Sequence, residues 1–466
     1  MTSPSTVSPS TFDQLSEDAL TERSERAGEP SWLLERRLEA HKRFLDQPWP
    51  DSSQDEFWRS TPFSKRFDVS APLVADEPGE VSVATLLSEL ESPAASVTIV
   101  DGVVTDVTVP TEVADRGVVV TDLATAALEH PELVREHLGS LTTSTPESSG
   151  GDEDRTVTAN DAAWTAGAFV HVPADVELDE PIGVHVHVTR PGAHLPRVLV
   201  VVDHHAAAKL YLEHTGGAAD EHVLVDEVLE AIVGDGARLD MASLQEWDDS
   251  VAHLSLQKVA AHKDASVRHL SVTMGGATVR LRPECDLLGP GADVRPLGVY
   301  FADEGQWFDL QPYVRHLAPR ATSDVLFKGA LQGHSRTVFR GNIFVHKDAV
   351  GTDTDENNKS LILTEGARAD ATPFLEIECA DIVAGHGSAT GQIDALQLYY
   401  LTSRGIPREQ ALRLIVTGFF REVFSGVQLP GVEEAALERI DALVDAADLS
   451  SFQINDASLQ DLRDEE

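Results

Sequence analysis

A repeat of about 28 residues runs through the middle of the chain, a length typical of proteins built from stacked structural units. Short runs of alternating apolar residues recur from about residue 169 to 390, and small-residue turns separate them. Six alanines in these turns follow one another at nearly constant intervals: Ala208, Ala237, Ala265, Ala292, Ala321 and Ala349. Such a repeat in a strand-rich segment predicts stacked coils, because one coil buries its apolar face only against a neighbour. We therefore predict a β-helix (β-solenoid) over residues 169–393, with a β-sandwich as the alternative.

The residues before the repeat predict a helical and mixed α/β region over 1–168. Apolar residues between Pro30 and Pro48 recur at helical spacing, which predicts a helix there. Asp101 and Gly102 separate two alternating runs, as in a hairpin. The polar stretch 142–156 predicts a mobile loop. Because a solenoid has unpaired strand edges at its two ends, we expect the flanking helical regions to cap them.

The residues after the repeat predict a helical domain over 394–466. Asp394 and Gln397 have the spacing of a capping box at a helix start. Gly405 is placed to end this first helix, and Pro407 to begin a second. Phe419 lies on the apolar face expected for the second helix, and a third helix follows in 432–449.

The charge of the chain is strongly negative. The 466 residues include 78 acidic and 36 basic residues, a formal net charge of -42 spread along the whole sequence. This balance indicates a protein adapted to a very salty cytoplasm, where ions screen the self-repulsion. Nucleic-acid binding is disfavoured because no basic patch stands out. The first residues do not resemble a signal peptide, and no long run of apolar residues occurs, so we expect a cytoplasmic location and no membrane contact.

Cysteine and histidine usage limits the possible metal sites. The two cysteines, Cys285 and Cys379, exclude a disulfide framework and a metal site made of cysteines alone. Both are interpreted as core residues. His185 and His187 share one face of a predicted strand and form a possible metal pair, but a solvent-facing histidine stripe is the favoured interpretation.

A glycine-rich segment precedes the first C-terminal helix. Gly385, Gly387 and Gly391 form G-x-G-x-x-x-G, close to a dinucleotide-binding fingerprint. A second helix rather than a second strand follows Gly405, which argues against a Rossmann unit. No phosphate-binding G-x-x-x-x-G-K-[ST] sequence occurs, so we expect no nucleotide site in this chain. His386, between two of the glycines, is either a packed histidine in a tight turn or a metal ligand or proton carrier.

The same segment carries a resemblance to a known family. "ADIVAGHGSATGQIDALQLYYLTSRGI", residues 380–406, resembles the SufD family, in which a strand ends in a histidine-containing loop before a "YYLxSRGI" helix. Residues 351–378 are similar to that family's final coils. "GEPSWLLERRLEAHKRFLDQPWP" and "AGAFVHVPADVELDEPI" match the pattern of the SufB/SufD superfamily. The acidic composition points to a halophilic archaeal type.

The resemblance implies a right-handed parallel β-helix and a role in iron–sulfur cluster assembly. It implies a scaffold subunit, not an enzyme, that pairs with a SufB-like paralogue along the β-helices. A SufC-like ATPase would dock on the C-terminal helices. The predicted docking residues are Leu396, Tyr399, Tyr400, Arg404, Gly405 and Phe419.

Two positions favour SufD over SufB. SufB carries a cysteine shortly before the Pro-x-Leu-Glu strand, and residues 365–369 contain none; SufB also normally has an acidic residue where this chain has Gly387. His386 matches the SufD histidine thought to act on a transient cluster at the interface with SufB. SufD members often have a cysteine at the position of Ala384, so Cys379 is kept as a possible substitute.

Two other functions remain alternatives at this point. One is a SufB-like cluster scaffold that uses Cys379, and the other is a β-helix protein that binds acidic polysaccharide. The sequence leaves flavin binding open.

Overall fold

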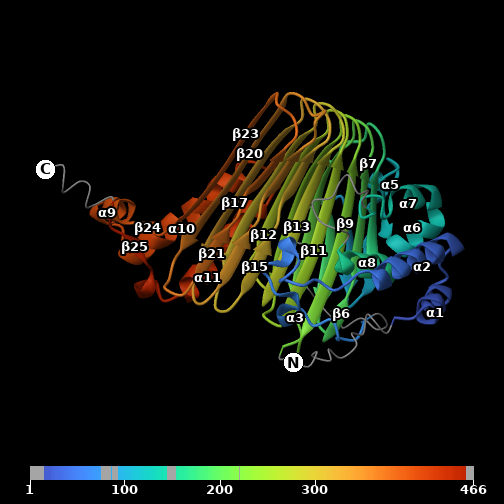
Figure 1. The fold of residues 1–466 in the computed structure, drawn as a ribbon, viewed down its shortest axis with the longest axis horizontal. Helices are drawn as coiled ribbons and strands as arrows, with labels where there is room; N and C mark the ends of the chain where they lie inside the picture. The colour runs from blue at the N-terminus through green and yellow to red at the C-terminus, as the bar shows by residue number, and fades with distance from the viewer. Residues whose placement is uncertain (1–14, 75–85, 87–92, 144–153, 220, 458–466) are drawn as a thin grey trace.

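The computed structural model describes residues 15–74, 86, 93–143, 154–219 and 221–457. Its centre is a parallel β-solenoid of about eight turns, in which the chain alternates between a ten-stranded and a thirteen-stranded sheet (Figure 1). Most strands pair in parallel with the equivalent strand of the next coil, as β10 does with β8 and β12, whereas β1–β2 and β3–β4 are antiparallel pairs near the N-terminal end. The β-helix prediction is confirmed, and the sandwich alternative is excluded by this parallel pairing.

The two sheets have the following strands. The ten-stranded sheet runs in the order β2 (Val103–Thr108), β1 (Ala95–Val100), β5 (Ile182–Val188), β8 (Ala207–Gly216), β10 (Arg238–Trp247), β12 (Ser266–Thr273), β14 (Asp293–Ala302), β17 (Thr322–Leu331), β20 (Thr352–Ile362) and β23 (Ile382–Gly391). The other contains β3 (Val119–Asp122), β4 (Ala166–Val172), β6 (Gly192–His194), β7 (Pro196–Val202), β9 (Val223–Val233), β11 (Val251–Ala261), β13 (Thr278–Leu287), β15 (Trp307–Leu310), β16 (Tyr313–His316), β18 (Arg336–Phe339), β19 (Asn342–Val345), β21 (Arg368–Ala371) and β22 (Phe374–Ile377).

The positions of the six turn alanines can be compared with the register in which successive coils pair. Four of them lie at equivalent positions of consecutive coils and are buried: Ala237, Ala265, Ala292 and Ala321. The two outer ones are out of register: Ala208 pairs with Leu239, and Ala349 lies three residues before Thr352, which is the position equivalent to Ala321. The sequence period was therefore correct in the central coils and wrong by a few residues at each end, where the turns differ in length.

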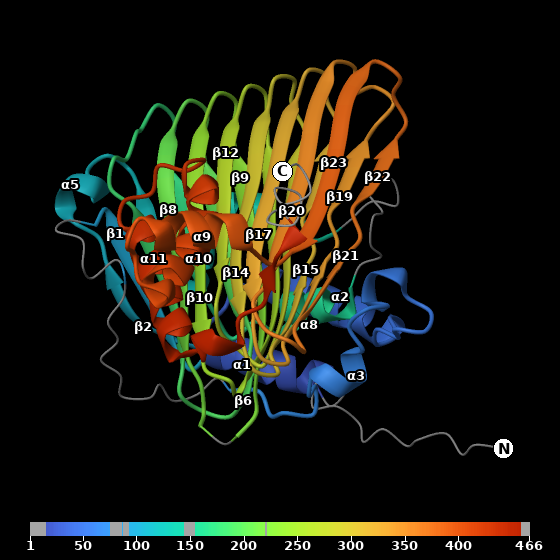
Figure 2. The same ribbon diagram turned by 90° about the vertical axis from the view of Figure 1, so that its left-hand side faces the viewer.

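The C-terminal helices lie on a face of the solenoid rather than on its end. Helices α9 (Ala395–Ser403), α10 (Arg408–Phe424) and α11 (Val432–Ala446) cover the outer face of the ten-stranded sheet (Figure 2). There Val416 and Phe420 pack with Leu297 and other apolar residues of β12, β14 and β17. The expected capping of the C-terminal end is thus wrong. The outer face of the ten-stranded sheet carries apolar residues on several strands. Covering this face therefore removes more apolar surface from water than covering the edge of the last strand would.

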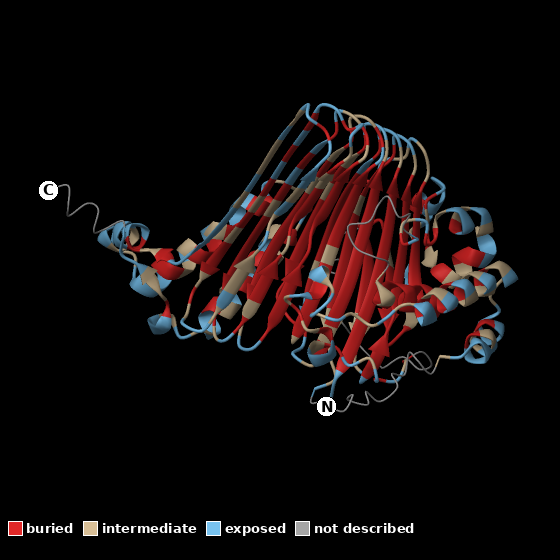
Figure 3. Cartoon of the chain, in the orientation of Figure 1, coloured by how far each residue is buried: buried red, intermediate tan, exposed pale blue. Residues whose placement is uncertain are grey.

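The final coil, β21 to β23, is consequently open. These strands are the last of their sheets, and no strand among the described residues pairs with their outer edges. Phe374, Ile377 and Val383 are exposed there (relative areas of 51%, 42% and 66%). Burial falls from the middle of the solenoid toward this coil (Figure 3).

The N-terminal helices cover the other sheet. Of these helices, α2 (Ser31–Asp46) and α8 (Arg155–Ala163) pack with β9 and its neighbours; the others are α1 (Glu17–Ala27), α3 (Phe63–Arg66), α6 (Leu123–Glu129) and α7 (Pro131–His137). The short helix α5 (Thr111–Ala114) differs, because its Val113 packs in the apolar core of the solenoid. The predicted helix after Pro30 is confirmed.

The predicted hairpin is confirmed as well. Asp101 and Gly102 both have positive φ, 48° and 77°, between the antiparallel strands β1 and β2. A tight hairpin turn requires this backbone conformation. Strand β1 also pairs with β5, so residues before 169 already belong to the solenoid. Most of the predicted loop, 144–153, lies outside the described residues. No described helix is long and apolar enough to span a membrane.

A buried ion network joins the N-terminal region to the solenoid. Arg197 on β7 is 1% exposed and donates to Asp161 of α8 (2.6 Å) and to Glu230 of β9. Glu230 also accepts hydrogen bonds from the backbone N–H groups of Gly139 and Leu141, at 2.6 and 2.8 Å. The arginine is thus the buried cation that the two carboxylates share.

Replacing Arg197 with methionine should destabilise the chain by about 3–5 kcal/mol, because two buried carboxylates lose their shared counter-ion. Guanidinium unfolding followed by circular dichroism measures this loss. Arg368→Met removes an exposed partner of Asp370, which Arg336 continues to bind. This control should cost less than about 1 kcal/mol. Equal losses in the two variants would contradict the interpretation.

Candidate functional site

His386 lies in the middle of a strand, not in a loop. All ten residues of β23 pair with β20, from Thr352–Ile382 to Leu361–Gly391, and His386 is the partner of Glu356. The expected bend at the histidine is therefore wrong. Strand β20 supplies a full-length row of backbone partners, which keeps the glycine-rich segment extended. The short strand β24 (Ile393–Asp394) follows and pairs with β25 (Ile454–Asn455) before α9 begins.

The glycines make room for side chains of the neighbouring strand. A Cβ atom on Gly385 would lie 2.6 Å from Asp355 Oδ1, and one on Gly387 would lie 2.7 Å from Asn357 Oδ1. Both glycines are in the strand, so the segment lacks the strand–turn–helix geometry of a dinucleotide loop. Gly385 and Gly387 thus allow close packing between the last two strands of the sheet, whereas a Cβ on Gly391 would meet no atom within 4 Å.

The inner face of the last coils is polar. Five alternate residues of β20 are buried inside the solenoid: Thr352, Thr354, Glu356, Asn358 and Ser360. The Tyr300 hydroxyl donates to Asn358 Oδ1 at 3.0 Å and lies 2.9 Å from Ser360 Oγ. Because paired residues of parallel strands share a face, His386 lies on the same inner face as Glu356. It is exposed because no described coil follows.

Glu356 is a buried carboxyl group beside the histidine-bearing strand. It is 1% exposed, and neither carboxylate oxygen has a hydrogen-bond partner among the described residues. A Cβ on Gly341 would lie 2.1 Å from Oε1, so glycine at this position lets the carboxyl reach the opposite wall. Burial, assisted by the nearby charge of Asp355, raises the pKa of Glu356 to about 8. The group therefore holds a proton at neutral pH and becomes an anionic ligand only when a cation or a base arrives.

Both cysteines lie in the core. Cys285 is fully buried, and burial raises the pKa of its thiol; Cys379 is 8% exposed and packs in the main apolar cluster. Cys379 lies in the corner before β23, whereas His386 is four residues beyond the start of that strand. At a rise of about 3.3 Å per residue, the histidine lies roughly 13 Å along the strand. The structure does not bring Cys379 to the histidine.

The predicted docking residues divide into two groups. Helix α9 buries Ala395 and Leu398 and leaves Leu396, Tyr399 and Tyr400 exposed (36%, 62% and 57%). We call these last three residues the α9 face.

The start and end of α9 follow the sequence prediction closely. Asp394 accepts from the N–H of Leu396 at 2.9 Å and so caps the helix, although through a different residue from the capping-box partner Gln397. Gly405 follows the helix with φ of 88°. The Arg404 guanidinium lies 5.1 Å from the centre of the Tyr400 ring, so it extends the α9 face.

Phe419 belongs to the second group. Its ring packs against Phe420 and the Lys328 ammonium, and its carbonyl accepts from Lys328 Nζ at 2.8 Å. It therefore contributes to the attachment of α10 to the sheet, and the sequence pattern alone did not distinguish this from a free surface.

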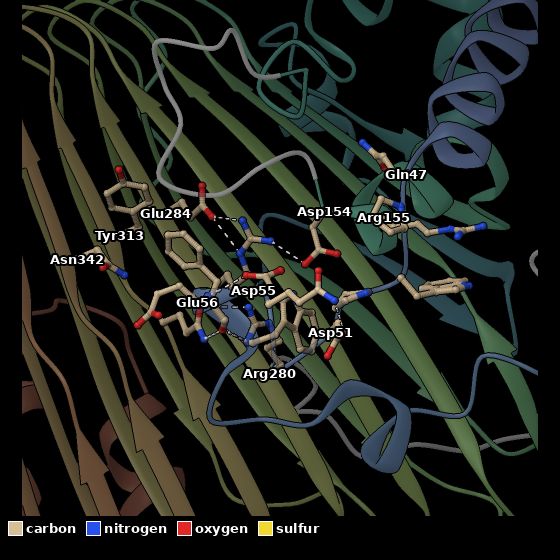
Figure 4. Close-up of a pocket in the computed structure, with 18 of the residues that line it drawn as sticks. Gln47, Asp51, Asp55, Glu56, Asp154, Arg155, Arg280, Glu284, Tyr313 and Asn342 are labelled. Carbon is tan, nitrogen blue, oxygen red and sulfur yellow. Dashed lines mark hydrogen bonds and ion pairs between the residues drawn. The ribbon is translucent and has the colours of Figure 1, made fainter. Parts of the chain in front are cut away.

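A charged cleft between the N-terminal region and β13 was not recognised in the sequence. Its volume is about 970 Å³, and Figure 4 shows its lining residues. Arg280 is bonded to Asp309 at 2.6 Å and to the carbonyl of Phe57, and Arg282 to Glu284 at 2.7 Å. Since the arginines already have anionic partners within the chain, the cleft is a seam between two parts of the fold rather than an anion site.

The histidine pair on β5 differs from its prediction. His185 is 5% exposed, its Nε2 lies 2.9 Å from Thr215 Oγ1, and burial lowers its pKa to about 3. His187 Nδ1 lies 2.8 Å from the same oxygen. The pair therefore contributes to buried packing, and the interpretation as a solvent-facing stripe is wrong for His185.

These features define a class of protein: a β-solenoid with an apolar core and helices on both outer faces, whose last coils have a polar inner face that ends at an exposed histidine. Residues 185–419 match the family model described as "SUF system FeS cluster assembly, SufBD core domain", and residues 23–184 match the SufBD protein N-terminal region. The chain therefore belongs to the SufBD family of iron–sulfur cluster assembly proteins.

Individual relatives agree with this assignment. A SufBD family protein of Mycobacterium tuberculosis is 40% identical over 306 residues, 62% of this chain and 75% of the relative. The protein SufD of Bacillus subtilis is 27% identical over 428 residues, 90% of this chain and 96% of the relative. A SufBD family protein of Staphylococcus epidermidis is 27% identical over 417 residues, 87% of this chain and 88% of the relative.

Proposed function

We propose that this chain is a SufD-like scaffold subunit for iron–sulfur cluster assembly. It pairs with a SufB-like paralogue through the open final coil and docks a SufC-like ATPase on the α9 face, while it hydrolyses no substrate itself. The match of the SufBD core model to the solenoid carries the proposal. We place the protein in a cytoplasm of high salt concentration, because ions there would screen the self-repulsion of a net charge of -42. The iron–sulfur cluster would be bound only transiently, as cargo.

The geometry of the final coil supports pairing. The outer edge of β23 has no strand partner in the described part of the chain, and exposed Phe374, Ile377 and Val383 lie on the same coil. An exposed strand edge of this kind pairs readily with another chain. His386 lies exposed on the inner face of this last strand, so its ring would lie near the interface with the partner.

The α9 face supports docking of a second partner. It places two exposed tyrosines and a leucine together on a helix that the other described residues leave uncovered on this side. Aromatic residues of this kind are the usual energetic anchors of protein interfaces. The SufB-like alternative finds less support, because Cys379 is buried in the main apolar cluster and is not brought to His386.

The double variant Tyr399→Ala, Tyr400→Ala should lower the affinity for the ATPase subunit at least about tenfold, because each ring is an exposed interface anchor. Co-purification and titration with the isolated ATPase measure this. Leu128 is also an exposed apolar residue (54%), but it lies on α6 at the other face, and Leu128→Ala should leave the affinity unchanged. Unchanged binding by the tyrosine variant would overturn the docking assignment.

A further inference from the structure

Three buried side chains with metal-binding atoms converge inside the solenoid, in its N-terminal half. His214 of β8, Glu227 of β9 and His253 of β11 each offer one ligand atom, and these atoms all lie within 4.8 Å of one another. Two of the strands belong to successive coils, since β11 pairs with β9. Each residue is at most 1% exposed. The three residues come from three separate strands, so no local sequence motif identifies the cluster.

The contacts within the cluster are incomplete. His214 Nε2 lies 2.7 Å from Glu227 Oε1, and the Ser255 hydroxyl donates to Glu227 Oε2 at 2.9 Å. His253 Nε2 lies 3.7 Å from the same Oε2. That separation is too long for a hydrogen bond. Neither ring nitrogen of His253 has a hydrogen-bond partner in the described part of the chain. A fully buried imidazole without partners costs free energy, so its presence indicates a ligand.

Neighbouring side chains enclose the cluster. The Trp247 ring lies 5.4 Å from His214 and 5.6 Å from His253 between ring centres, so it closes one side.

We propose that His214, Glu227 and His253 bind one divalent transition metal ion of the zinc or iron(II) class inside the solenoid. Two imidazoles and a carboxylate are a ligand set that these ions take, with the remaining position open to the Ser255 hydroxyl or to water. The ion would link β8, β9 and β11 across adjacent coils. This inference goes beyond the proposed scaffold function and does not depend on it.

The competing explanation is a buried ion pair between protonated His214 and Glu227, with His253 as packing. The two explanations differ in metal content. Because the cluster is enclosed, the ion should enter while the coils assemble. The full chain is therefore unfolded in guanidinium with EDTA, refolded with Zn²⁺ or Co²⁺, desalted and analysed for bound metal by mass spectrometry. The visible absorption of bound Co²⁺ reports its coordination.

The wild-type chain should retain about one ion, show Co²⁺ ligand-field bands and unfold at a higher denaturant concentration than the EDTA-refolded chain. His253→Gln should lower the retained metal about tenfold or more while changing the metal-free stability little, because His253 makes no hydrogen bond with the described residues.

His269→Gln is the matched control for this experiment. His269 is another buried inner histidine, bonded to Gln257 at 2.8 Å, and its loss should leave the metal content unchanged. Equal metal content in the wild type and His253→Gln, including none in either, overturns the site in favour of the ion pair.

Discussion

Glu356→Gln should make the protein more stable at pH 8 and leave it nearly unchanged at pH 5. Burial raises the pKa of Glu356 to about 8, from 4.5 in the unfolded chain. Between these two values the folded chain holds one more proton than the unfolded chain. The free energy of unfolding therefore falls as pH rises through this window, by about 1.4 kcal/mol per pH unit and about 5 kcal/mol in total. Glutamine has the same shape but does not ionise, so the free energy of unfolding of the variant should not show this decrease with pH.

The measurement is a series of urea unfolding curves from pH 5 to pH 8.5 for both chains. Their difference isolates Glu356, since the other titrating groups are common to both. Glu365→Gln changes an exposed glutamate in the turn after β20 and should keep the wild-type pH profile. A Glu356→Gln profile parallel to that of the wild type would show that the carboxyl ionises freely in the folded chain.

The second large effect concerns His386. His386→Ala should form the complex with the paralogue and the ATPase, yet build iron–sulfur clusters at least about tenfold more slowly, because imidazole is both a metal ligand and a proton carrier near neutral pH. The side chain is exposed at the end of the solenoid, so its removal leaves no cavity in the core. Anaerobic reconstitution with iron, sulfide and ATP measures the rate, and gel filtration measures assembly.

His334→Ala is the matched control for this experiment. His334 lies in an outer turn of the solenoid with 80% of its side chain exposed, and its loss should affect neither assembly nor rate. Cluster formation by His386→Ala at the wild-type rate would remove His386 from the site. Failure to assemble would instead make His386 an interface residue with no separate part in cluster chemistry.

The sequence predicted the parts of the fold that repeat locally. The alanine interval recurs because each central coil needs nearly the same length of chain to pass through both sheets, and the central alanines fill equivalent buried corners. Helix limits were predictable for a similar reason. The Asp394 cap and the positive φ of Gly405 depend on residues next to the helix end. Such signals can be recognised in the sequence because the residues that form the helix ends are close neighbours along the chain.

The site residues were only partly predictable. His386 was identified, but its strand conformation depends on pairing with β20, the equivalent strand of the preceding coil. Glu356 looked like one more acid in an acidic chain. Only the stacking of coils places it inside, opposite Gly341 and without a partner among the described residues. The cluster of His214, Glu227 and His253 likewise has no spacing to recognise, because its members meet across coils.

The amino-acid sequence by itself determined the coil, its period, the helical tail and the exclusion of a phosphate-binding loop. Only the tertiary structure decided which surfaces the helices cover, which coil stays open and which polar groups face inward. The reason is physical: a repeat is set by contacts within and between adjacent coils, whereas burial and pKa depend on every strand that encloses a side chain.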